Sequence, residues 1–408
     1  MRTMPAAALI AVLMSGPAAL AGASDADEIR ELRAQIDLLN ERLRALEQRA
    51  GLTEPTVSPA EPAPAVAAAE PEPALDWARG LSLGGDLRVR HEHLERDGLP
   101  DRERQRVRAR LAVNAEITET VDATVGFATG GDDPRSANQT LGANFTRKSL
   151  GLDLAYFDWH PLEGLNVYGG KMKYVAFKPA MTTFIDGDLN PEGFAVAWQS
   201  ESGLFATASS YWIEERALTV DSMWWIGQLG WRGSIGDGIS LAAVASYHDF
   251  ANVQGQKPFY LLQSFGNSTD ADGALLYDYD IAKLAFEVGF GLGTLPVRLF
   301  GEYGQNVAVD DLDTAWSLGF LVGKASKPGS WEFGYLYGDT EKDALFAQVI
   351  ESDFADGRTD SRGHALRAGY AIAKNWTANL QIYLNDLNVS GETTIGFDRL
   401  QLDLNFKY

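Results

Sequence analysis

Apolar and polar residues alternate with a period of two along most of the chain, from about residue 81 to the C-terminus. This spacing places successive side chains on opposite faces of an extended strand. Roughly sixteen segments follow it, each about ten residues long, which is enough for a tilted strand to cross a bilayer. The predicted strands are 81–92, 104–118, 121–130, 149–159, 165–175, 191–200, 204–214, 223–235, 239–249, 279–291, 297–305, 314–324, 330–339, 363–372, 376–387 and 395–408. The pattern therefore predicts an all-β fold.

The connections between these segments alternate between short and long, with few exceptions. The short ones are 118–121, 161–165, 201–203, 236–238, 293–296, 327–329 and 373–375. The long ones include 93–103, 131–148, 176–190, 250–278 and 340–362. Short turns at one end and long loops at the other are typical of outer-membrane barrels. An even number of strands places both ends of the barrel on the short-turn side, which is the periplasm.

Aromatic residues distinguish a membrane barrel from a soluble β-sandwich, whose strands alternate as well. In the last predicted strand, leucines and aromatic residues between 400 and 408 share one face, and polar residues occupy the other. Aromatic residues near segment ends on the apolar face are Trp225, Trp231, Tyr247, Trp316, Trp331, Tyr335, Tyr337, Tyr370 and Trp376. This is the position at which aromatic rings contact both lipid and water. We therefore predict a roughly 16-stranded antiparallel transmembrane β-barrel.

Arginines recur at every second position of the first two predicted strands. They are Arg88, Arg90, Arg104, Arg106, Arg108 and Arg110. Facing lipid, each would cost roughly 2–4 kcal/mol near the bilayer midplane, so the ladder must face a water-filled lumen. A barrel closes its last strand on its first, so Arg399 and Lys407 are expected to extend the same wall.

The remaining predicted pore-lining residues are distributed over the other strands. They are Glu116, Lys171, Lys173, Arg232, Lys283, Arg298 and Arg367. Lys171 and Lys173 point inward if Met172 and Tyr174 point outward. The basic residues could attract anionic solutes, or they could pair with inward carboxylates and brace the wall. Enough acids are present for pairing (Asp86, Glu92, Glu116, Asp153 and Asp403), and we favour bracing as the main role.

The N-terminal part divides into three segments. Residues 1–21 resemble a secretory signal peptide, with Arg2, an apolar core at 6–14 and a small-residue cleavage site at Ala21. Residues 25–50 form three heptads, which predict a self-associating coiled coil in the periplasm. Its core positions are Ile29, Leu32, Ile36, Leu39, Leu43 and Leu46. Residues 51–76 form a Pro/Ala-rich linker, and residues 77–408 form the barrel.

Composition narrows the possible partners and chemistry. The formal net charge of -21 argues against nucleic acid as a partner, because binding of its phosphates requires clustered positive charge on the protein. The chain has no cysteine, which fits an exported protein without disulfides.

His91 and His93 could share a metal on one strand face, but we favour a solvated pair. Ser246 and His248 share a face without a well-placed acid, so a barrel hydrolase is disfavoured. We therefore predict no enzyme activity, no cofactor and no metal.

Several runs resemble the "putative porin" family of Gram-negative outer membranes. They are GDLRVR at 85–90, RVRARL at 106–111, FATG at 127–130, NQTLG at 138–142, LDLAYFDW at 152–159, GGKMK at 169–173 and DGDLNPEG at 186–193. The resemblance covers nearly the whole chain after the signal, including the coiled coil. It implies a passive channel, similar in plan to general and phosphate-selective porins, with no settled substrate.

The sequence thus predicts passive diffusion of small hydrophilic solutes and ions across the outer membrane. Expected partners are outer-membrane lipid, lipopolysaccharide and further copies of the chain, in a homotrimer. The loop 176–190 is short for an inward fold, so we expect 131–148 or 250–278 to narrow the pore. Alternatives are a substrate-specific, for example anion-selective, channel and an envelope tether with the barrel as its anchor.

Overall fold

The computed structural model describes residue 41, residues 80–236 and residues 238–408. The chain divides into two compact units, residues 1–72 and residues 73–408, and the account below concerns the second. The predicted signal peptide and linker, and the coiled coil apart from residue 41, lie outside the described residues. Among the described residues, no helix has the length and apolar character needed to cross a membrane.

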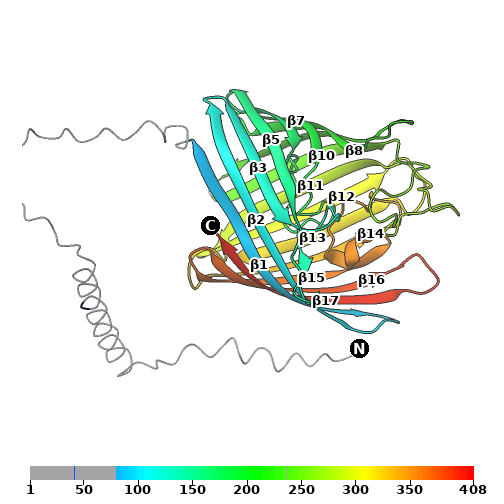
Figure 1. Ribbon diagram of the computed structural model, residues 1–408. Coiled ribbons are helices and arrows are strands. Elements are labelled where there is room, and N and C mark those ends of the chain that lie inside the picture. Colours follow the sequence, from blue (N-terminus) through cyan, green and yellow to red (C-terminus); the bar gives the residue numbers. More distant parts are fainter. Residues whose placement is uncertain (1–40, 42–79, 237) are drawn as a thin grey trace, which may run out of the picture. The chain divides into compact units, whose positions relative to one another are not determined.

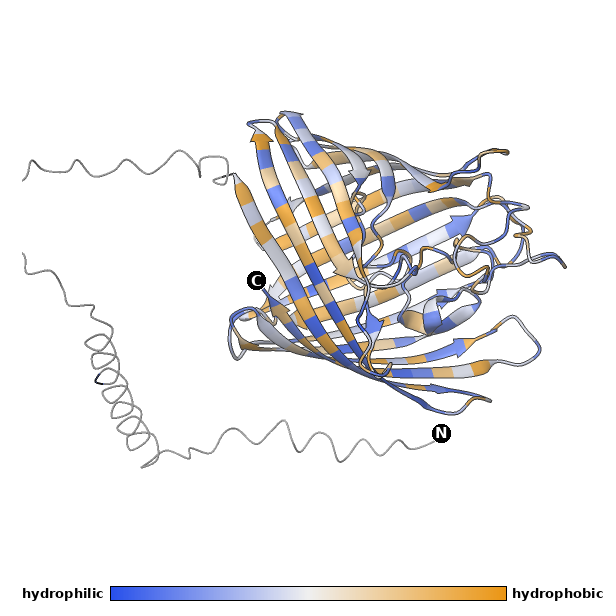
Figure 2. Cartoon of the chain, viewed as in Figure 1, coloured by the Kyte–Doolittle hydropathy of each residue, from blue (hydrophilic) through white to orange (hydrophobic). Residues whose placement is uncertain are grey.

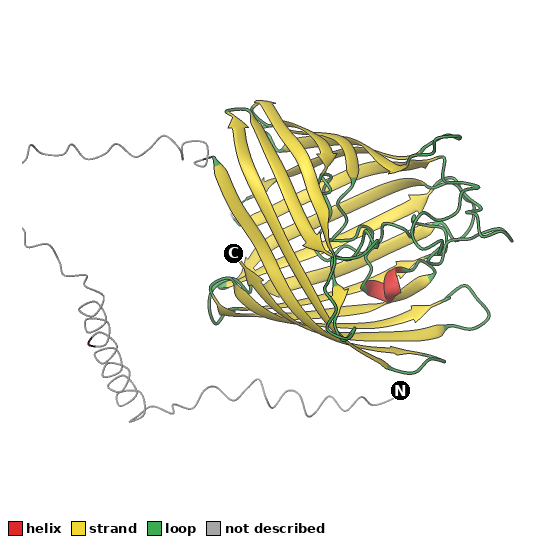
Figure 3. Cartoon of the chain, in the orientation of Figure 1, coloured by secondary structure: helices red, strands yellow, loops and turns green. Residues whose placement is uncertain are grey.

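One sheet contains all seventeen strands of the described part of the chain (Figure 3). The strands are β1 (Leu81–Arg96), β2 (Arg102–Thr118), β3 (Val121–Thr129), β4 (Gln139–Thr140), β5 (Leu150–Leu162), β6 (Leu165–Lys171), β7 (Glu192–Gln199), β8 (Leu204–Glu214), β9 (Ser222–Ile235), β10 (Ile239–Ala251), β11 (Asp280–Leu292), β12 (Leu295–Asn306), β13 (Thr314–Gly323), β14 (Trp331–Thr340), β15 (Ser361–Ala373), β16 (Trp376–Leu387) and β17 (Ile395–Lys407). The two-residue β4 pairs only with β2, which leaves sixteen long strands. The 3-10 helix η2 (Phe354–Gly357) lies between β14 and β15.

The sheet closes on itself, because β1 pairs with both β2 and β17 in antiparallel register. Asp86, for example, lies opposite Arg110 on one side and Lys407 on the other. Figure 1 shows the resulting barrel, with the long loops and η2 toward the end opposite the C-terminus. The predicted sixteen-stranded antiparallel barrel is confirmed.

The two faces of the strands differ as the period-two pattern predicts. On β9, the side chain of Trp224 is 2% exposed, whereas that of its neighbour Trp225 is 49% exposed. Leu229, Leu284 and Leu318 are likewise exposed on the outer surface of their strands. Figure 2 shows hydrophobic and hydrophilic residues alternating along the strands. An apolar outer surface of this kind is stable in lipid, which confirms transmembrane strands.

The first two strands are longer than their apolar pattern predicted. The segment 93–103 was expected to be a loop, but β1 continues to Arg96 and β2 begins at Arg102. Paired residues in this part include His93 with Glu103. Backbone hydrogen bonds extend the hairpin past the apolar belt, where the outward side chains become polar and the apolar alternation ends.

Placing a charge first on the outer and then on the inner face of β2 tests this orientation. Val113 faces outward, and the next residue, Asn114, is exposed on the opposite face. Val113→Arg should lower the free energy of unfolding by roughly 2–4 kcal/mol, because it places a charge against lipid. The matched control Asn114→Arg should change it little, since its side chain remains in water. Denaturant titration in lipid vesicles measures both values, and equal losses would contradict the assignment of faces.

Candidate functional site

Two loops turn back into the barrel and pack against its inner wall. One comprises residues 172–191, between β6 and β7, and the other residues 341–360, between β14 and β15. Phe184 of the first loop and Phe346 of the second are 2% and 1% exposed. They belong to an apolar cluster that includes the inward-facing Trp224 of β9. Burying this many apolar side chains holds the loops in place without contact with lipid.

The expectation that 176–190 is too short to fold inward is therefore wrong. Loop length was a poor criterion, because the apolar residues Phe184, Ile185 and Leu189 decide the direction of this loop. They are buried against the second inward loop rather than exposed outside the barrel.

Backbone hydrogen bonds join the two inward loops directly. The Asp186 N–H donates to the carbonyl of Val349 at 2.9 Å, and the Glu351 N–H donates to the carbonyl of Thr183 at 3.2 Å. The Asp186 carboxylate in turn accepts from the Ser352 N–H at 2.8 Å. The two loops thus form one unit inside the barrel.

A third loop, residues 130–149, is tied to this unit by a buried arginine. Arg135 is 3% exposed and donates to the carbonyls of Ala347 and Gly357, at 2.9 and 3.1 Å. Its guanidinium also lies 4.2 Å from the ring centre of Phe265, in the loop after β10. Gly357 has a φ of +65°, and a Cβ there would lie 2.8 Å from the Arg135 guanidinium. Both the conformation and the close approach therefore favour glycine at this position.

Opposite these loops, the inner wall of β1 and β2 carries arginines that face one another. Arg88 lies opposite Arg108, and Arg90 opposite Arg106. Like charges at directly opposed positions repel each other, so the pairing of these strands needs carboxylates nearby. Closure of the barrel supplies one of them, because Asp403 of β17 lies opposite Arg90.

Carboxylates from the strands pair with most of this arginine wall. Arg90 binds Asp403 through Nε at 2.7 Å and Nη2 at 2.9 Å, in a bidentate arrangement that favours specific geometry. Asp86 contacts Arg108 at 2.8 Å and Arg110 at 2.6 Å. The other pairs are Glu92 with Arg104 and Arg106, and Asp403 with Arg88 at 3.9 Å.

The inward loops supply further partners that reach across the lumen. Asp188 of the first loop contacts Arg108 at 3.1 Å and Arg110 at 3.3 Å. Asp353 of the second loop contacts Arg90 at 3.0 Å and Arg399 at 2.8 Å. Asp356, in η2, also contacts Arg399, at 2.8 Å.

Sequence reasoning missed the loop carboxylates as partners of the wall. Asp186 and Asp188 lie between two predicted strands, so the period-two alternation does not indicate where their side chains point. The run DGDLNPEG, which carries part of the family resemblance, was the signal that could have marked this loop.

A cavity of about 240 Å³ lies between the arginine wall and the inward loops. Arg88 and Arg90 line one side, and Asp186, Asp188 and Asp353 line another. Leu336, Phe354 and Tyr383 are also part of its lining. Two larger cavities lie toward the ends of the barrel. One, of about 610 Å³, is lined by residues of the long-loop end, and the other, of about 800 Å³, by residues near the short turns.

Other predicted pore-lining residues also lie on inner faces of the strands. Lys283 contacts Glu302 at 2.8 Å and is 5% exposed, so it is a buried pair rather than a free cation. The remaining cases are Arg298 with Glu287 at 3.3 Å, Arg367 with Glu332 at 3.3 Å, Arg232 over the ring of Phe205 at 4.1 Å, and the exposed Lys407.

Three expectations about individual residues are wrong. Met172 is fully buried inside the barrel, so Lys171 lies on the outer face, where it pairs with Glu192 at 3.0 Å. Strand β6 ends at Lys171, which leaves Lys173 on an exposed loop position outside the strand alternation. Asp153 accepts a hydrogen bond from Asn190 at 2.9 Å instead of bracing the arginines.

Glu116 lies near the end of β2, and its backbone N–H donates to Gly80 at 2.9 Å. Its side chain is exposed at the short-turn end, six positions beyond Arg110, the last arginine of the strand. Ser246 and His248 lie 3.2 Å apart, with His248 3% exposed and packed on Trp224.

A closed barrel with an apolar outer face, a charged inner wall and inward loops defines the class of outer-membrane diffusion channels. The comparisons place the chain within this class. The model of the family described as "Putative porin" matches residues 94–275 and 277–408. The chain therefore belongs to this family, and it is an outer-membrane porin that allows passive diffusion of solutes. No curated protein sequence matches it.

Solved porin structures share the fold at low sequence identity. OprB of Pseudomonas putida, in a high-pH structure, aligns with a TM-score of 0.56 and 10% identity, over 81% of this chain and 95% of OprB. OmpF of Salmonella typhi, in a complex with daunomycin, aligns with a TM-score of 0.50 and 12% identity, over 81% of this chain and 99% of OmpF.

The carboxyl groups of the inward loops predict a pH dependence. Burial raises the pKa of Glu351 to about 7, and the neighbouring Asp353 and Asp188 carboxylates add to the shift. Burial also raises the pKa of Asp186 well above its usual range. A raised carboxyl pKa stabilises the folded state fully below the unfolded value of 4.5, and this stabilisation is lost as the pH rises through about 7.

The stability of the wild-type barrel should therefore fall from about pH 5 to about pH 8, and Glu351→Gln should reduce this slope. Urea titrations of both proteins in lipid vesicles measure the difference. Parallel pH curves for the two proteins would contradict a titrating Glu351.

Proposed function

We propose that solutes cross the barrel through the 240 Å³ cavity between the arginine wall and the two inward loops. We propose that this cavity is the narrowest part of their path. The order of the cavities supports this path, because the larger ones lie toward the long-loop end and the short-turn end. The observation that carries the proposal is the lining itself, with arginines on one side and loop carboxylates on another. The short-turn end faces the periplasm.

Opposed charges across a narrow passage favour small hydrophilic solutes. They produce a field across the pore that orients polar molecules, whereas an apolar solute would have to displace bound water without replacing its hydrogen bonds.

Ion preference is expected to be weak, because the arginines of the wall are paired with carboxylates of the strands and the inward loops. The paired arginines are Arg88, Arg90, Arg104, Arg106, Arg108, Arg110 and Arg399, and their partners are Asp86, Glu92, Asp188, Asp353, Asp356 and Asp403. This pairing supports bracing as the main role of the arginines and disfavours a dedicated anion channel.

We also propose that copies of the chain assemble as a homotrimer. Membership of a porin family supports this assembly, as do the heptads predicted for residues 25–50, although they lie outside the described residues apart from residue 41. The mass of the native complex extracted in mild detergent tests the proposal, and a monomer mass would contradict it.

Replacing Arg106, Arg108 and Arg110 by serine tests the role of the wall. The change leaves Asp86, Glu92 and Asp188 with fewer cationic partners, so the lumen becomes more negative. The reversal potential across a salt gradient in a planar bilayer should then shift toward cation selectivity.

Arg362→Ser is the matched control, because Arg362 pairs with Asp386 at 3.5 Å and both side chains are largely exposed. It should leave the reversal potential unchanged. A triple variant that folds and conducts with wild-type selectivity would place the solute path away from this wall.

A further inference from the structure

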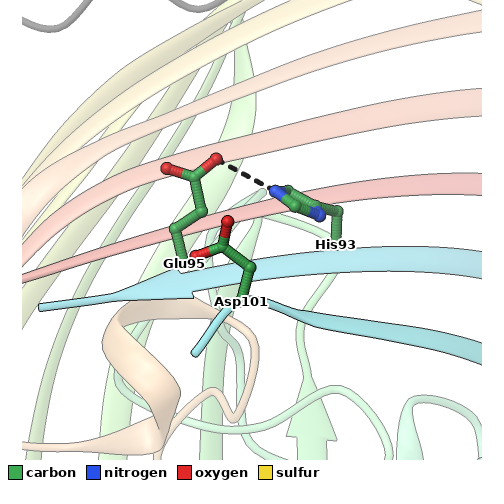
Figure 4. Close-up of side chains that lie close together, drawn as sticks. All are labelled: His93, Glu95 and Asp101. Atoms are coloured by element: carbon green, nitrogen blue, oxygen red, sulfur yellow. Dashed lines mark hydrogen bonds and ion pairs between the residues drawn. The ribbon is translucent and has the colours of Figure 1, made fainter. Parts of the chain in front are cut away.

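A second cluster of charged side chains lies where the hairpin of β1 and β2 ends, on the face opposite the arginine wall. His93 contacts Glu95 through Nε2 at 2.9 Å and Glu103 through Nδ1 at 2.6 Å. Glu103 also contacts His91, at 3.2 Å, so both histidines meet at one carboxylate. Figure 4 shows His93 and Glu95 in contact with Asp101 beside them.

These groups converge closely enough for one ion. The ligand atoms offered by His93, Glu95 and Asp101 all lie within 4.8 Å of one another. The side chains of His93 and Glu95 are 25% and 42% exposed, so they can rotate without disturbing packed neighbours. Small rotations would bring them and Asp101 to the roughly 2.0–2.2 Å that zinc requires from nitrogen and oxygen ligands.

The cluster lies just beyond the lipid-facing belt. Going along the outer face of the hairpin, Val89 lies opposite Val107, and the next outward pair is His91 with Gln105. The pair after that is His93 with Glu103. The outward side chains thus change from apolar to ligand-bearing at the level where lipid tails give way to head groups and water. None of them faces the lumen, so the channel itself does not use them.

We propose that His93, through Nε2, together with Glu95 and Asp101 binds a divalent transition-metal ion of the Zn²⁺ class, while Glu103 holds the other ring nitrogen of His93. Imidazole nitrogen combined with carboxylate oxygen favours zinc and its neighbours, whereas Ca²⁺ and Mg²⁺ prefer oxygen ligands alone. The ligands come from β1 and from the turn after it, and Glu103 of β2 orients the imidazole, so the site involves both strands of the hairpin. A bound ion would stabilise the pairing of the two strands on the outer face, whereas the opposed arginines lie on the inner face.

Zinc titration calorimetry of the protein purified from outer membranes tests the site. The wild type should bind Zn²⁺ and not Ca²⁺, and His93→Ala should weaken Zn²⁺ binding by at least about ten-fold. The matched control is His160→Ala, because His160 lies 3.8 Å from a single carboxylate, that of Asp122. This variant should bind Zn²⁺ as the wild type does.

A second variant and a second measurement distinguish loss of Zn²⁺ binding from loss of the folded barrel. Glu103→Gln keeps the size of the side chain and should also weaken Zn²⁺ binding, while heat-modifiable electrophoretic mobility verifies the folded barrel. Co²⁺ added to the wild type should give visible absorption bands that the His93 variant lacks. Equal Zn²⁺ affinity in the wild type and a folded His93→Ala variant would overturn the proposal.

Discussion

The structure depends on arginines that face one another across the first two strands. Arg88 opposes Arg108 and Arg90 opposes Arg106, so the backbone pairing of β1 and β2 brings four cations together on one inner wall. Water alone would screen them only in part, because Arg90 is 1% exposed and Arg108 is 9% exposed. Carboxylates must therefore lie close to them, and those that come from other elements connect this wall to the rest of the barrel.

Besides Asp86 and Glu92 of β1 itself, two other parts of the barrel provide carboxylates, and each has a structural consequence. Asp403 lies on β17, so its bidentate contact with Arg90 stabilises the seam at which the barrel closes. Asp188 and Asp353 lie on the inward loops, so their contacts hold those loops across the lumen. The same ion pairs thus close the barrel and narrow its passage.

Apolar packing makes the narrowing rigid. The ion pairs fix one side of the inward loops, and the cluster around Trp224, Phe250 and Phe346 fixes the other. The loops therefore sit between a charged wall and an apolar wall of the same barrel. In the proposed path, solutes pass on the charged side of the loops and not on the apolar side.

The sequence by itself determined the strands, the two faces and the arginine wall. Side chains alternate strictly along a strand, so Leu400 and Arg399 must lie on opposite faces wherever the strand is placed. It also indicated that the first and last strands meet. Only the tertiary structure decided that residues 172–191 and 341–360 fold inward and that Asp188 and Asp353 reach the arginines. Loop backbones have no fixed period, so their direction follows from packing against distant strands, which local sequence does not encode. The same reason explains the error at Lys173, because β6 ends at Lys171 and the alternation ends with it.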